Sequence, residues 1–238
     1  TNENLGYAGG NNIGLKYSFK GGFDYTVLLN NDVILPKDIL TKLVRIAEKD
    51  QKIGLLAPKM YFAKGYEFHK DRYKESELGK VFWYAGGFID WNNVYSKHRG
   101  VDEVDRGQYD KEEVVDAANG ACLLIRKNVI RDIGLLKDKY FMYWEDADYC
   151  IRAKKAGWKV VYTPETELWH KVSSSSAIGS NLNDYFLTRN RLDFGLRYAP
   201  LKTKLALIKE SMKLLISGRS WQKIGVRDYY LGKWGKGS

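Results

Sequence analysis

The sequence contains little cysteine and no long uninterrupted apolar run. Its two cysteines, Cys122 and Cys150, form neither a disulfide framework nor the paired spacing of a zinc finger, and each lies in an apolar segment. We therefore expect buried free thiols in a reducing compartment. No apolar run approaches the roughly 18 residues of a membrane-spanning helix, and no signal peptide is recognisable. The sequence thus excludes a disulfide-stapled scaffold and predicts no transmembrane helix.

An initiator methionine and an obvious first strand are also missing, since the chain opens with Thr1-Asn2-Glu3-Asn4. We expect that the complete protein has further residues before Thr1. Internal repeats are not visible either.

What is present indicates a packed globular protein. The 238 residues suffice for one substantial domain or two small ones, and 44% hydrophobic residues with seven tryptophans argue against disorder. The formal net charge of +10 favours anionic partners, which are nucleic acid, phosphorylated small molecules or an acidic membrane face. Nucleic acid is disfavoured among these, because basic and acidic residues alternate and no recognition motif occurs.

A first polar cluster follows a predicted buried strand. Tyr25 to Leu29 is β-branched and apolar, as in a strand that is buried on both faces of a parallel sheet. It ends in Asn30, Asn31 and Asp32, and open α/β sheets bind their ligands at this end of the strands. A helix and a second apolar strand follow, which predicts an α/β domain.

A second polar cluster begins a predicted helix. Glu145 and Asp146 open an amphipathic helical pattern that Gly157 would end. Burial would raise the pKa of a carboxylate at this position, whereas free backbone N–H groups would lower it. Such a carboxylate is a candidate general base. Alternatively, the acidic residues only cap the first turn, and Asp148 pairs with Arg152.

His170 is the third polar feature, and it follows an apolar strand. A single histidine is more often structural than catalytic, but a carboxylate with a later imidazole suits a divalent cation bound to phosphate oxygens. A separate carboxylate suits deprotonation of an attacking hydroxyl. Together, Asp32, Asp146 and His170 suit a reaction in which a phosphate is the leaving group and a hydroxyl is the attacking group.

Glycine, other small residues and proline suggest a turn, close packing or the end of a strand at four further positions. Asn4 to Asn12 has three glycines, which allow close approach of the backbone to a ligand, although an ordinary turn before a helix explains them equally. Small residues from Ala118 to Ala121 interrupt an apolar strand, which suggests that something packs against the backbone there. Two other strands are expected to stop at Pro58 and Pro164.

The chain changes character toward its end, where Asn183 to Tyr198 has a helical pattern. The helix after it is basic and amphipathic. Its apolar positions are Leu201, Leu205, Ile208, Met212 and Leu215. Such a helix is either a membrane-surface or partner-binding element, or a core-packing helix with a solvated lysine face.

Several ordered motifs make the chain similar to family 2 glycosyltransferases of the GT-A fold, in the rhamnosyltransferase-like branch that builds surface polysaccharides. The motifs are Asn4 to Asn12, Leu28 to Val33, Gly120 to Arg126, Tyr140 to Arg152, Gly157 to Pro164, His170 and Arg189-Asn190. The resemblance implies an α/β fold with a Rossmann-like mixed sheet flanked by helices over residues 1–180, and a helical C-terminal extension over residues 181–238. It also implies N-terminal truncation, because the family begins with a strand, a helix and a strand that carry a nucleoside-binding Asp.

The resemblance further implies roles for single residues. Asp32 and His170 would bind the metal, and Asp146 would be the catalytic base with Glu145 beside it. Asn30 occupies the first acidic position of the family's Asp-x-Asp motif. The residues on the donor side would be Asn4, Gly9, Gly10, Asn11, Asn30, Asn31 and Asp32. The residues on the acceptor side would be Asn119, Gly120 and Trp144.

The implied function is inverting transfer of a sugar from a nucleotide-diphosphate donor, with dTDP-rhamnose expected and UDP-galactofuranose or a UDP-hexose as alternatives. The cofactor would be a divalent cation, Mg²⁺ or Mn²⁺, and the acceptor a growing cell-surface glycan or a lipid-linked sugar. The expected location is cytoplasmic, with peripheral contact to the inner face of the cell membrane and no nucleic-acid partner. A glycan-binding or scaffold protein with a degenerate active site is the competing interpretation.

Overall fold

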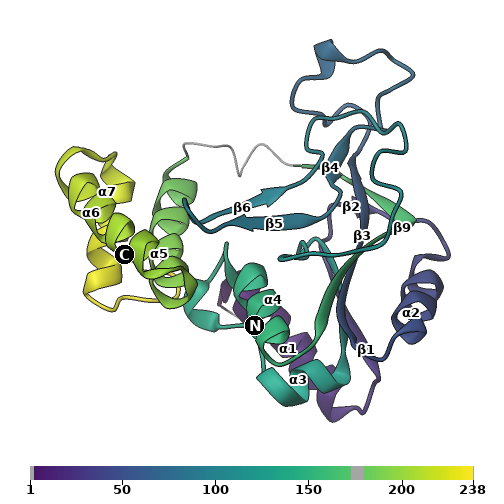
Figure 1. Cartoon of the computed structure of the whole chain (residues 1–238), viewed down its shortest axis with the longest axis horizontal. Helices are drawn as coiled ribbons and strands as arrows, with labels where there is room; N and C mark the ends of the chain where they lie inside the picture. The colour runs from purple at the N-terminus through teal and green to yellow at the C-terminus, as the bar shows by residue number, and fades with distance from the viewer. Residues whose placement is uncertain (1–2, 173–179, 238) are drawn as a thin grey trace.

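The computed structural model describes residues 3–172 and 180–237. A mixed sheet lies among helices, and further helices form one end of the molecule (Figure 1). The helices are α1 (Gly6–Lys20), α2 (Ile39–Lys49), α3 (Lys127–Ile133), α4 (Glu145–Lys155), α5 (Asn181–Tyr198), α6 (Leu201–Ser217) and α7 (Ser220–Tyr230), with 3-10 turns η1 (Lys70–Arg72) and η2 (Asp138–Tyr140). The strands are β1 (Tyr25–Leu29), β2 (Val33–Ile34), β3 (Ile53–Phe62), β4 (Phe82–Tyr84), β5 (Gly87–Asp90), β6 (Tyr95–His98), β7 (Glu113–Val114), β8 (Cys122–Arg126) and β9 (Lys159–His170).

The central sheet has the order β1-β8-β3-β9-β2, with β4 beside β3 and β7 beside β9. β3 and β9 are parallel, whereas β8 is antiparallel to both of its neighbours, β1 and β3. The expectation of a mixed α/β sheet flanked by helices is thus confirmed. The expectation that residues 25–29 form a doubly buried parallel strand is wrong, because β1 lies at the edge of this order and pairs antiparallel with β8.

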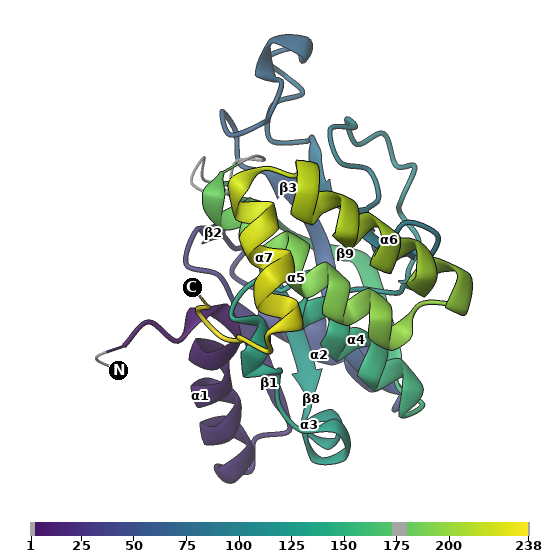
Figure 2. The ribbon, with the colours of Figure 1, turned by 90° about the vertical axis from the view of Figure 1, so that its left-hand side faces the viewer.

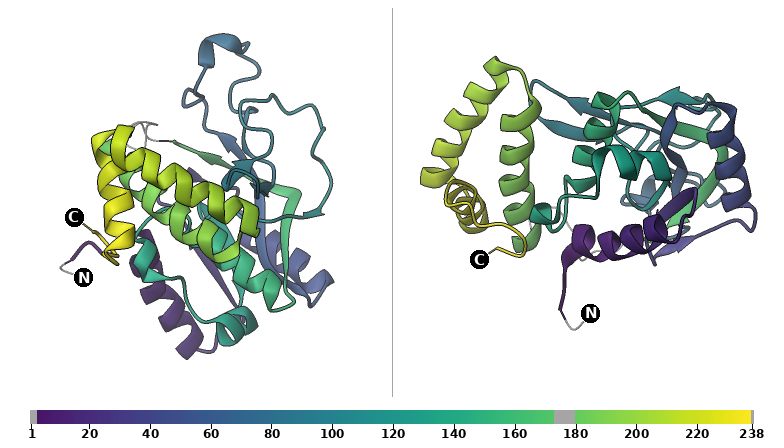
Figure 3. Two further views of the ribbon diagram at one scale, coloured as in Figure 1. Left: turned by 60° about the vertical axis from the view of Figure 1, so that its left-hand side comes forward. Right: turned by 90° about the horizontal axis from the view of Figure 1, so that it is seen from below.

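Helices cover both faces of the sheet. α2 and α4 both contact β3 and β9, and they lie on opposite sides of these strands (Figure 3, right). α1 and α3 lie on the α4 side. α2 buries Ile39, Leu43, Ile46 and Ala47, which recur at helical spacing. These side chains join one continuous core with the strands.

Helices α5, α6 and α7 form a group at one end of the molecule, and α5 lies between the other two and the sheet (Figures 1 and 2). A second hydrophobic cluster connects this group to the rest of the chain. It joins the β5–β6 hairpin through Ile89 and Val94, α4 through Ala147, α5 through Phe194 and α7 through Val226. Within the described ranges, no helix is long and apolar enough to cross a bilayer.

The glycine-rich segment is helical from Gly6 onward, so the helix expected after it forms and begins earlier than expected. α1 begins at Gly6 and contains Gly9, Gly10 and Asn11. Gly6 is the residue that requires glycine, because its φ is +69° and a Cβ there would lie 2.4 Å from the carbonyl oxygen of Phe141. The segment therefore serves a close contact between α1 and the residues before α4.

Strands β3 and β9 continue past Pro58 and Pro164, so the expectation that they stop there is wrong. Pro58 pairs with Thr163, and the next pair along the strands is Lys59 with Glu167. The register shifts between these pairs, and prolines are tolerated within sheets at such bulges. The extension takes β9 to His170.

Candidate active site

Seven of the predicted site residues line a single cleft of about 470 Å³. They are Asn30, Asp32, Asn119, Gly120, Glu145, Asp146 and His170. The cleft lies between the end of β1, the end of β9 and the start of α4. Tyr7 of α1, Trp83 of β4 and Leu187 of α5 also line it. The fold thus brings the three polar features of the sequence together.

Backbone pairing holds Asp32 next to His170. Val33 of β2 pairs with His170 of β9, and the Lys171 N–H donates to the Asp32 carbonyl oxygen at 2.8 Å. The side chains meet with 3.1 Å between Asp32 Oδ1 and His170 Nε2. Burial lowers the pKa of His170, although the nearby Asp32 carboxylate opposes the shift. A neutral imidazole beside a carboxylate follows.

This pair fits a divalent cation. Ligands in adjacent octahedral positions at about 2.1 Å from Mg²⁺ are roughly 3.0 Å apart, close to the observed separation of Asp32 and His170. Neutral imidazole and carboxylate are both accepted ligands of divalent metals. No cluster of three or more His, Cys, Asp or Glu side chains suited to a metal occurs in the described part of the chain. With two protein ligands, the other positions of an octahedral cation would be filled by oxygens of a bound molecule and by water.

The loop of residues 141–144, directly before α4, has a strained backbone. The φ angle is +64° at Phe141, +65° at Tyr143 and +74° at Trp144. Such angles cost about 1–3 kcal/mol for each non-glycine residue and persist only where the surroundings fix them. The 141–144 loop sets the start of α4, so these surroundings also position Glu145 and Asp146.

Two buried side chains of α5 provide this support. The Asn190 amide nitrogen donates to the carbonyl oxygens of Tyr140, Met142 and Tyr143 at 2.9, 2.8 and 3.0 Å. Arg189 donates to the carbonyl oxygens of residues 139 and 140, and from its other nitrogen to that of Gly235 at 3.0 Å. Both side chains are fully buried. The C-terminal helices therefore fix the loop that precedes the acidic pair.

Glu145 and Asp146 have different surroundings although they are adjacent. Glu145 is buried, and its Oε2 has no hydrogen-bond partner among the described residues. Burial, and after it the Asp146 charge, raises the pKa of Glu145 well above its ordinary value. Asp146 accepts the N–H groups of Gly120 at 3.3 Å and Ala147 at 2.7 Å. Burial raises the pKa of Asp146 too, but these N–H groups oppose the shift.

Of the two carboxyl groups, Asp146 is therefore the one that ionises more readily, because only its charge is supported by these N–H groups. Asp146 is in the first turn of α4, where the unpaired N–H groups of the helix favour an anion. An ionised carboxylate that lines a cleft can accept the proton of a hydroxyl.

The wall next to Asp146 contains two residues that were expected on the acceptor side, Asn119 and Gly120. The Gly120 carbonyl oxygen accepts a hydrogen bond from the Tyr7 hydroxyl at 2.6 Å, and a Cβ at Gly120 would lie 2.4 Å from that hydroxyl. The expectation of close packing against residues 118–121 is thus confirmed. Asn119 Nδ2 lies 3.1 Å from His98 Nε2. Burial lowers the pKa of His98 to about 4, so the neutral ring accepts from Asn119.

Tyr7 and His98 were not predicted from the sequence. Tyr7 is one of 17 tyrosines, and His98 is a lone histidine on the short strand β6. His98 reaches Asn119 because the β5–β6 hairpin folds toward the residues before β8. No local pattern in the sequence indicates that contact.

Six predicted residues lie outside the lining of this cleft. Asn4 accepts the Gly6 N–H at 2.9 Å at the start of α1, and Gly9, Gly10 and Asn11 lie within α1. Asn31 is exposed. Trp144 is buried against Phe194, with 4.6 Å between ring centroids.

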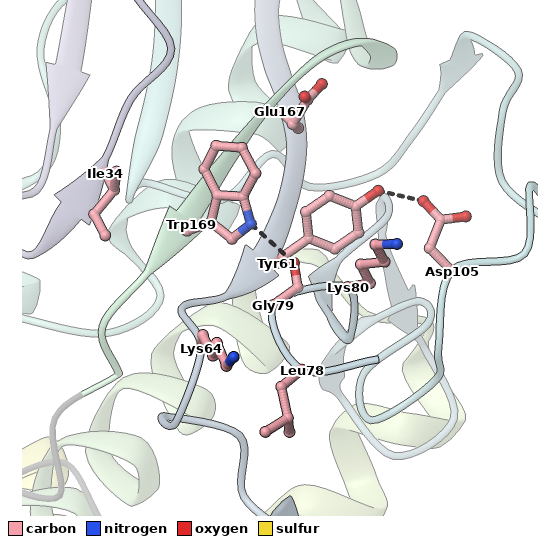
Figure 4. Close-up of a pocket in the computed structure, with 9 residues that line it drawn as sticks. All are labelled: Ile34, Tyr61, Lys64, Leu78, Gly79, Lys80, Asp105, Glu167 and Trp169. Carbon is pink, nitrogen blue, oxygen red and sulfur yellow. Dashed lines mark hydrogen bonds between the residues drawn. The ribbon is translucent and has the colours of Figure 1, made fainter. Parts of the chain in front are cut away.

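A larger hollow of about 550 Å³ lies near the same end of β9 (Figure 4). Tyr61 and Trp169 form part of its wall, where Trp169 Nε1 donates to the Gly79 carbonyl oxygen at 2.8 Å. Successive strand residues point to opposite faces, so Trp169 lines this hollow while His170 lines the cleft. The hollow contains none of the predicted site residues, and the cleft is therefore the candidate active site.

Two curated relatives match part of the chain. The low-salt glycan biosynthesis hexosyltransferase Agl10 of Haloferax volcanii is 26% identical over 153 residues, covering 64% of this chain and 44% of that protein. The N-acetylglucosaminyl-diphospho-decaprenol L-rhamnosyltransferase of Mycobacterium tuberculosis is 28% identical over 157 residues, covering 64% of this chain and 48% of that protein. The chain thus spans less than half the length of each relative.

Solved structures of glycosyltransferases also align with the chain. The mannosyltransferase PcManGT from Pyrobaculum calidifontis, in complex with GDP-Man and Mn²⁺, has 11% identity and a TM-score of 0.43 over 94% of this chain and 54% of that chain. GalNAc-T7 with UDP, GalNAc and Mn²⁺ has 14% identity and a TM-score of 0.47 over 84% of this chain and 41% of that chain. The model of the glycosyltransferase-like family 2 matches residues 4–200. The chain therefore belongs to the glycosyltransferase-like family 2.

Proposed function

We propose that this chain forms the catalytic part of a metal-dependent inverting glycosyltransferase. The donor is a nucleotide-diphosphate sugar, and the acceptor is a hydroxyl of a glycan or of a lipid-linked sugar. One observation supports this most directly: the Asp32–His170 pair and the Asp146 carboxylate line the same cleft.

The donor end is the side of Asp32, His170 and Asn30. Asp32 and His170 would hold the divalent cation, which would neutralise the negative charge of the departing diphosphate. Asn30 is fixed by its N–H, which donates to the Ala121 carbonyl oxygen at 3.0 Å. Asn30 lines the same cleft as Asp32, and its side-chain amide could donate to a phosphate oxygen there.

The acceptor end is the side of Asp146. Its carboxylate takes the proton of the acceptor hydroxyl while the hydroxyl oxygen attacks the anomeric carbon. The bond from that carbon to the diphosphate oxygen breaks, and its electron pair leaves with the diphosphate. A single displacement of this kind inverts the anomeric centre. Glu145 stays neutral, so that it does not repel the developing charge nearby.

The names of the relatives guide the choice of substrate. One is an L-rhamnosyltransferase, which supports dTDP-rhamnose as the donor, and the other is a hexosyltransferase, which keeps UDP-galactofuranose and a UDP-hexose as alternatives. The rhamnosyltransferase is named for a diphospho-decaprenol acceptor, which supports a lipid-linked acceptor for this chain.

Turnover of the candidate donors with Mg²⁺ or Mn²⁺ tests the proposal. We expect Asp146→Asn to lower the rate about 100-fold or more, which is typical for loss of a general base. Glu145→Gln should keep most of the rate, since a neutral glutamine replaces a neutral acid. Asp132→Asn, an aspartate of α3 outside the cleft, is the control.

Measurement of donor binding distinguishes a variant that has lost its catalytic base from a variant that has lost its fold. A donor that binds the native state raises the melting temperature, and Asp146→Asn should retain that rise. Equal turnover in Asp146→Asn and the wild type would remove Asp146 from its role. Saturable glycan binding without any metal-dependent donor turnover would instead favour a glycan-binding protein.

A further inference from the structure

The apolar face of helix α6 is turned away from the protein. Six of its residues form a stripe, here named the α6 stripe, and each of them is between 36% and 79% exposed: Leu201, Leu205, Ile208, Met212, Leu215 and Ile216. The side of α6 that is buried carries Thr203, Leu207 and Ser211. A surface helix of a globular protein normally turns its apolar stripe to the core. The arrangement on α6 is the reverse.

Lysines border the α6 stripe on both sides. At about 100° of rotation per residue, the stripe covers a sector of roughly 100°. Lys202, Lys209 and Lys213 follow at one edge of this sector, and Lys204 lies at the other. The single acidic residue of α6, Glu210, is bound by Arg191 of α5 at 2.8 Å. The outward side of α6 is therefore apolar along its middle and basic along its edges.

The position of α6 leaves this side accessible. α5 lies between α6 and the sheet, so α6 forms part of the outer surface at this end of the molecule (Figures 1 and 2). Contiguous exposed apolar residues on this scale mark an interaction site, whereas scattered ones do not.

We propose that α6 docks in the plane of an anionic lipid bilayer, with the α6 stripe at the boundary of the acyl chains and the lysines at the level of the phosphates. Helices that lie in membrane interfaces combine these two features. The lysines beside the α6 stripe favour a bilayer over a second copy of the chain. A second copy would bring two sets of lysines together, whereas anionic headgroups neutralise them. The inner leaflet of the cell membrane carries such headgroups. The proposal concerns a binding surface and does not require glycosyl transfer.

Sedimentation of the full chain with lipid vesicles tests the proposal. We expect binding to vesicles of phosphatidylcholine with about one third phosphatidylglycerol, weaker binding to phosphatidylcholine alone, and weakening by salt. Leu205→Gln/Ile208→Gln should lower the partition coefficient about tenfold or more, because two side chains lose their apolar burial in the bilayer.

The matched control is Leu40→Gln/Val44→Gln on α2. These side chains are 55% and 37% exposed, against 60% and 39% for Leu205 and Ile208, so the two pairs differ in position and hardly in exposure. The control should bind as the wild type does. Equal binding by both double variants, or no binding of the wild type to anionic vesicles, would overturn the proposal. A vesicle-free dimer that Leu205→Gln/Ile208→Gln converts to a monomer would overturn it too, in favour of a second copy of the chain. Donor turnover with a water-soluble acceptor is measured separately, so a failure here leaves the proposed function untouched.

Discussion

Glu145 and Asp146 follow each other in the sequence, yet the backbone N–H groups of Gly120 and Ala147 point at Asp146, while Glu145 is buried without comparable support for its Oε2 in the described chain. Neighbouring carboxyl groups whose pKa values are pushed apart in this way can act as one neutral and one charged group at the same pH. At this scale, the backbone N–H groups make Asp146 the stronger acid of the two and so the better candidate base.

Glu145→Gln should leave the folding stability unchanged in acid and raise it at neutral pH. The pKa of Glu145 is raised in the folded protein, so between its unfolded and folded values the native state binds more protons than the unfolded chain. The free energy of unfolding of the wild type therefore falls as the pH rises through that interval. Glutamine does not titrate and removes this loss. Urea denaturation of both proteins at a series of pH values measures the difference.

Glu77→Gln provides a control of the opposite sign. The Lys74 N–H lowers the pKa of Glu77, so its charged form stabilises the fold above the ordinary pKa of a glutamate. Its glutamine variant should lose stability relative to the wild type as the pH rises. A Glu145→Gln variant that changed in the same direction would contradict a raised pKa at Glu145.

At the scale of elements, α5 and the 141–144 loop behave as one unit. The loop holds three non-glycine residues at positive φ, and Arg189 and Asn190 bind the carbonyl oxygens around it. From the other side, Gly6 approaches Phe141 so closely that no side chain fits there. The start of α4 is thus fixed by two helices that are distant in sequence.

Asn190→Ala should lower kcat about 10- to 100-fold with little change in the KM of the donor. The variant leaves the carbonyl oxygens of residues 140, 142 and 143 without their buried amide donor, which costs about 1–3 kcal/mol of stability. The loop then relaxes and moves Asp146, and displacement of a reacting group by about 1 Å is enough for such a loss. Steady-state kinetics well below the melting temperature measures both constants. Asn181→Ala, at the exposed start of α5, is the control, and an equal kcat in both variants would show that Asn190 only stabilises the fold.

Local patterns predicted most of the elements, and they failed where distant segments decide the backbone. The apolar run at residues 25–29 and the acidic start of α4 are strong local signals, and both elements form. Pro58 did not end β3, because a register shift against β9 accommodates it. Gly6 lies at the start of a helix and not in a loop. Glycine is required there because a side chain would collide with Phe141.

The residues of the candidate site also include some that local sequence predicts and some that only tertiary packing places there. Asp32, Asp146 and His170 occupy the ends of strands or the start of a helix, where ligands commonly bind, and the structure brings them to one cleft. Tyr7 and His98 reach the same region through a helix and a hairpin whose placement depends on tertiary packing. Spacing in the sequence contains no signal for them.

At the scale of the whole molecule, the C-terminal helices share a hydrophobic cluster with the sheet domain. Phe194 of α5 is fully buried, with its ring centroid 4.6 Å from that of Trp144, 5.0 Å from Tyr198 and 5.8 Å from Trp91. A boundary at residue 180 would cut through this cluster. We therefore expect both parts of the described chain to unfold together.

Phe194→Ala should destabilise the whole chain by about 3–5 kcal/mol, the usual cost of truncating a buried phenylalanine. Calorimetry should show a single transition in the wild type and in the variant, shifted to lower temperature in the latter. Leu40→Ala, at an exposed position of α2, should change the stability by less than about 0.5 kcal/mol. Two transitions, of which Phe194→Ala shifts one alone, would mean that the helices fold independently.

The pairing of Val33 with His170 links ion affinity to strand geometry. β2 has two residues, and the first of them, Val33, pairs with His170, which is itself a proposed ligand of the cation. Fraying of this short ladder would separate the carboxylate from the imidazole, and a bound ion would in turn hold the ladder shut. We therefore expect that a change which weakens the pairing of β2 with β9 also lowers the affinity for the cation and the donor, and that cation binding stabilises this pairing.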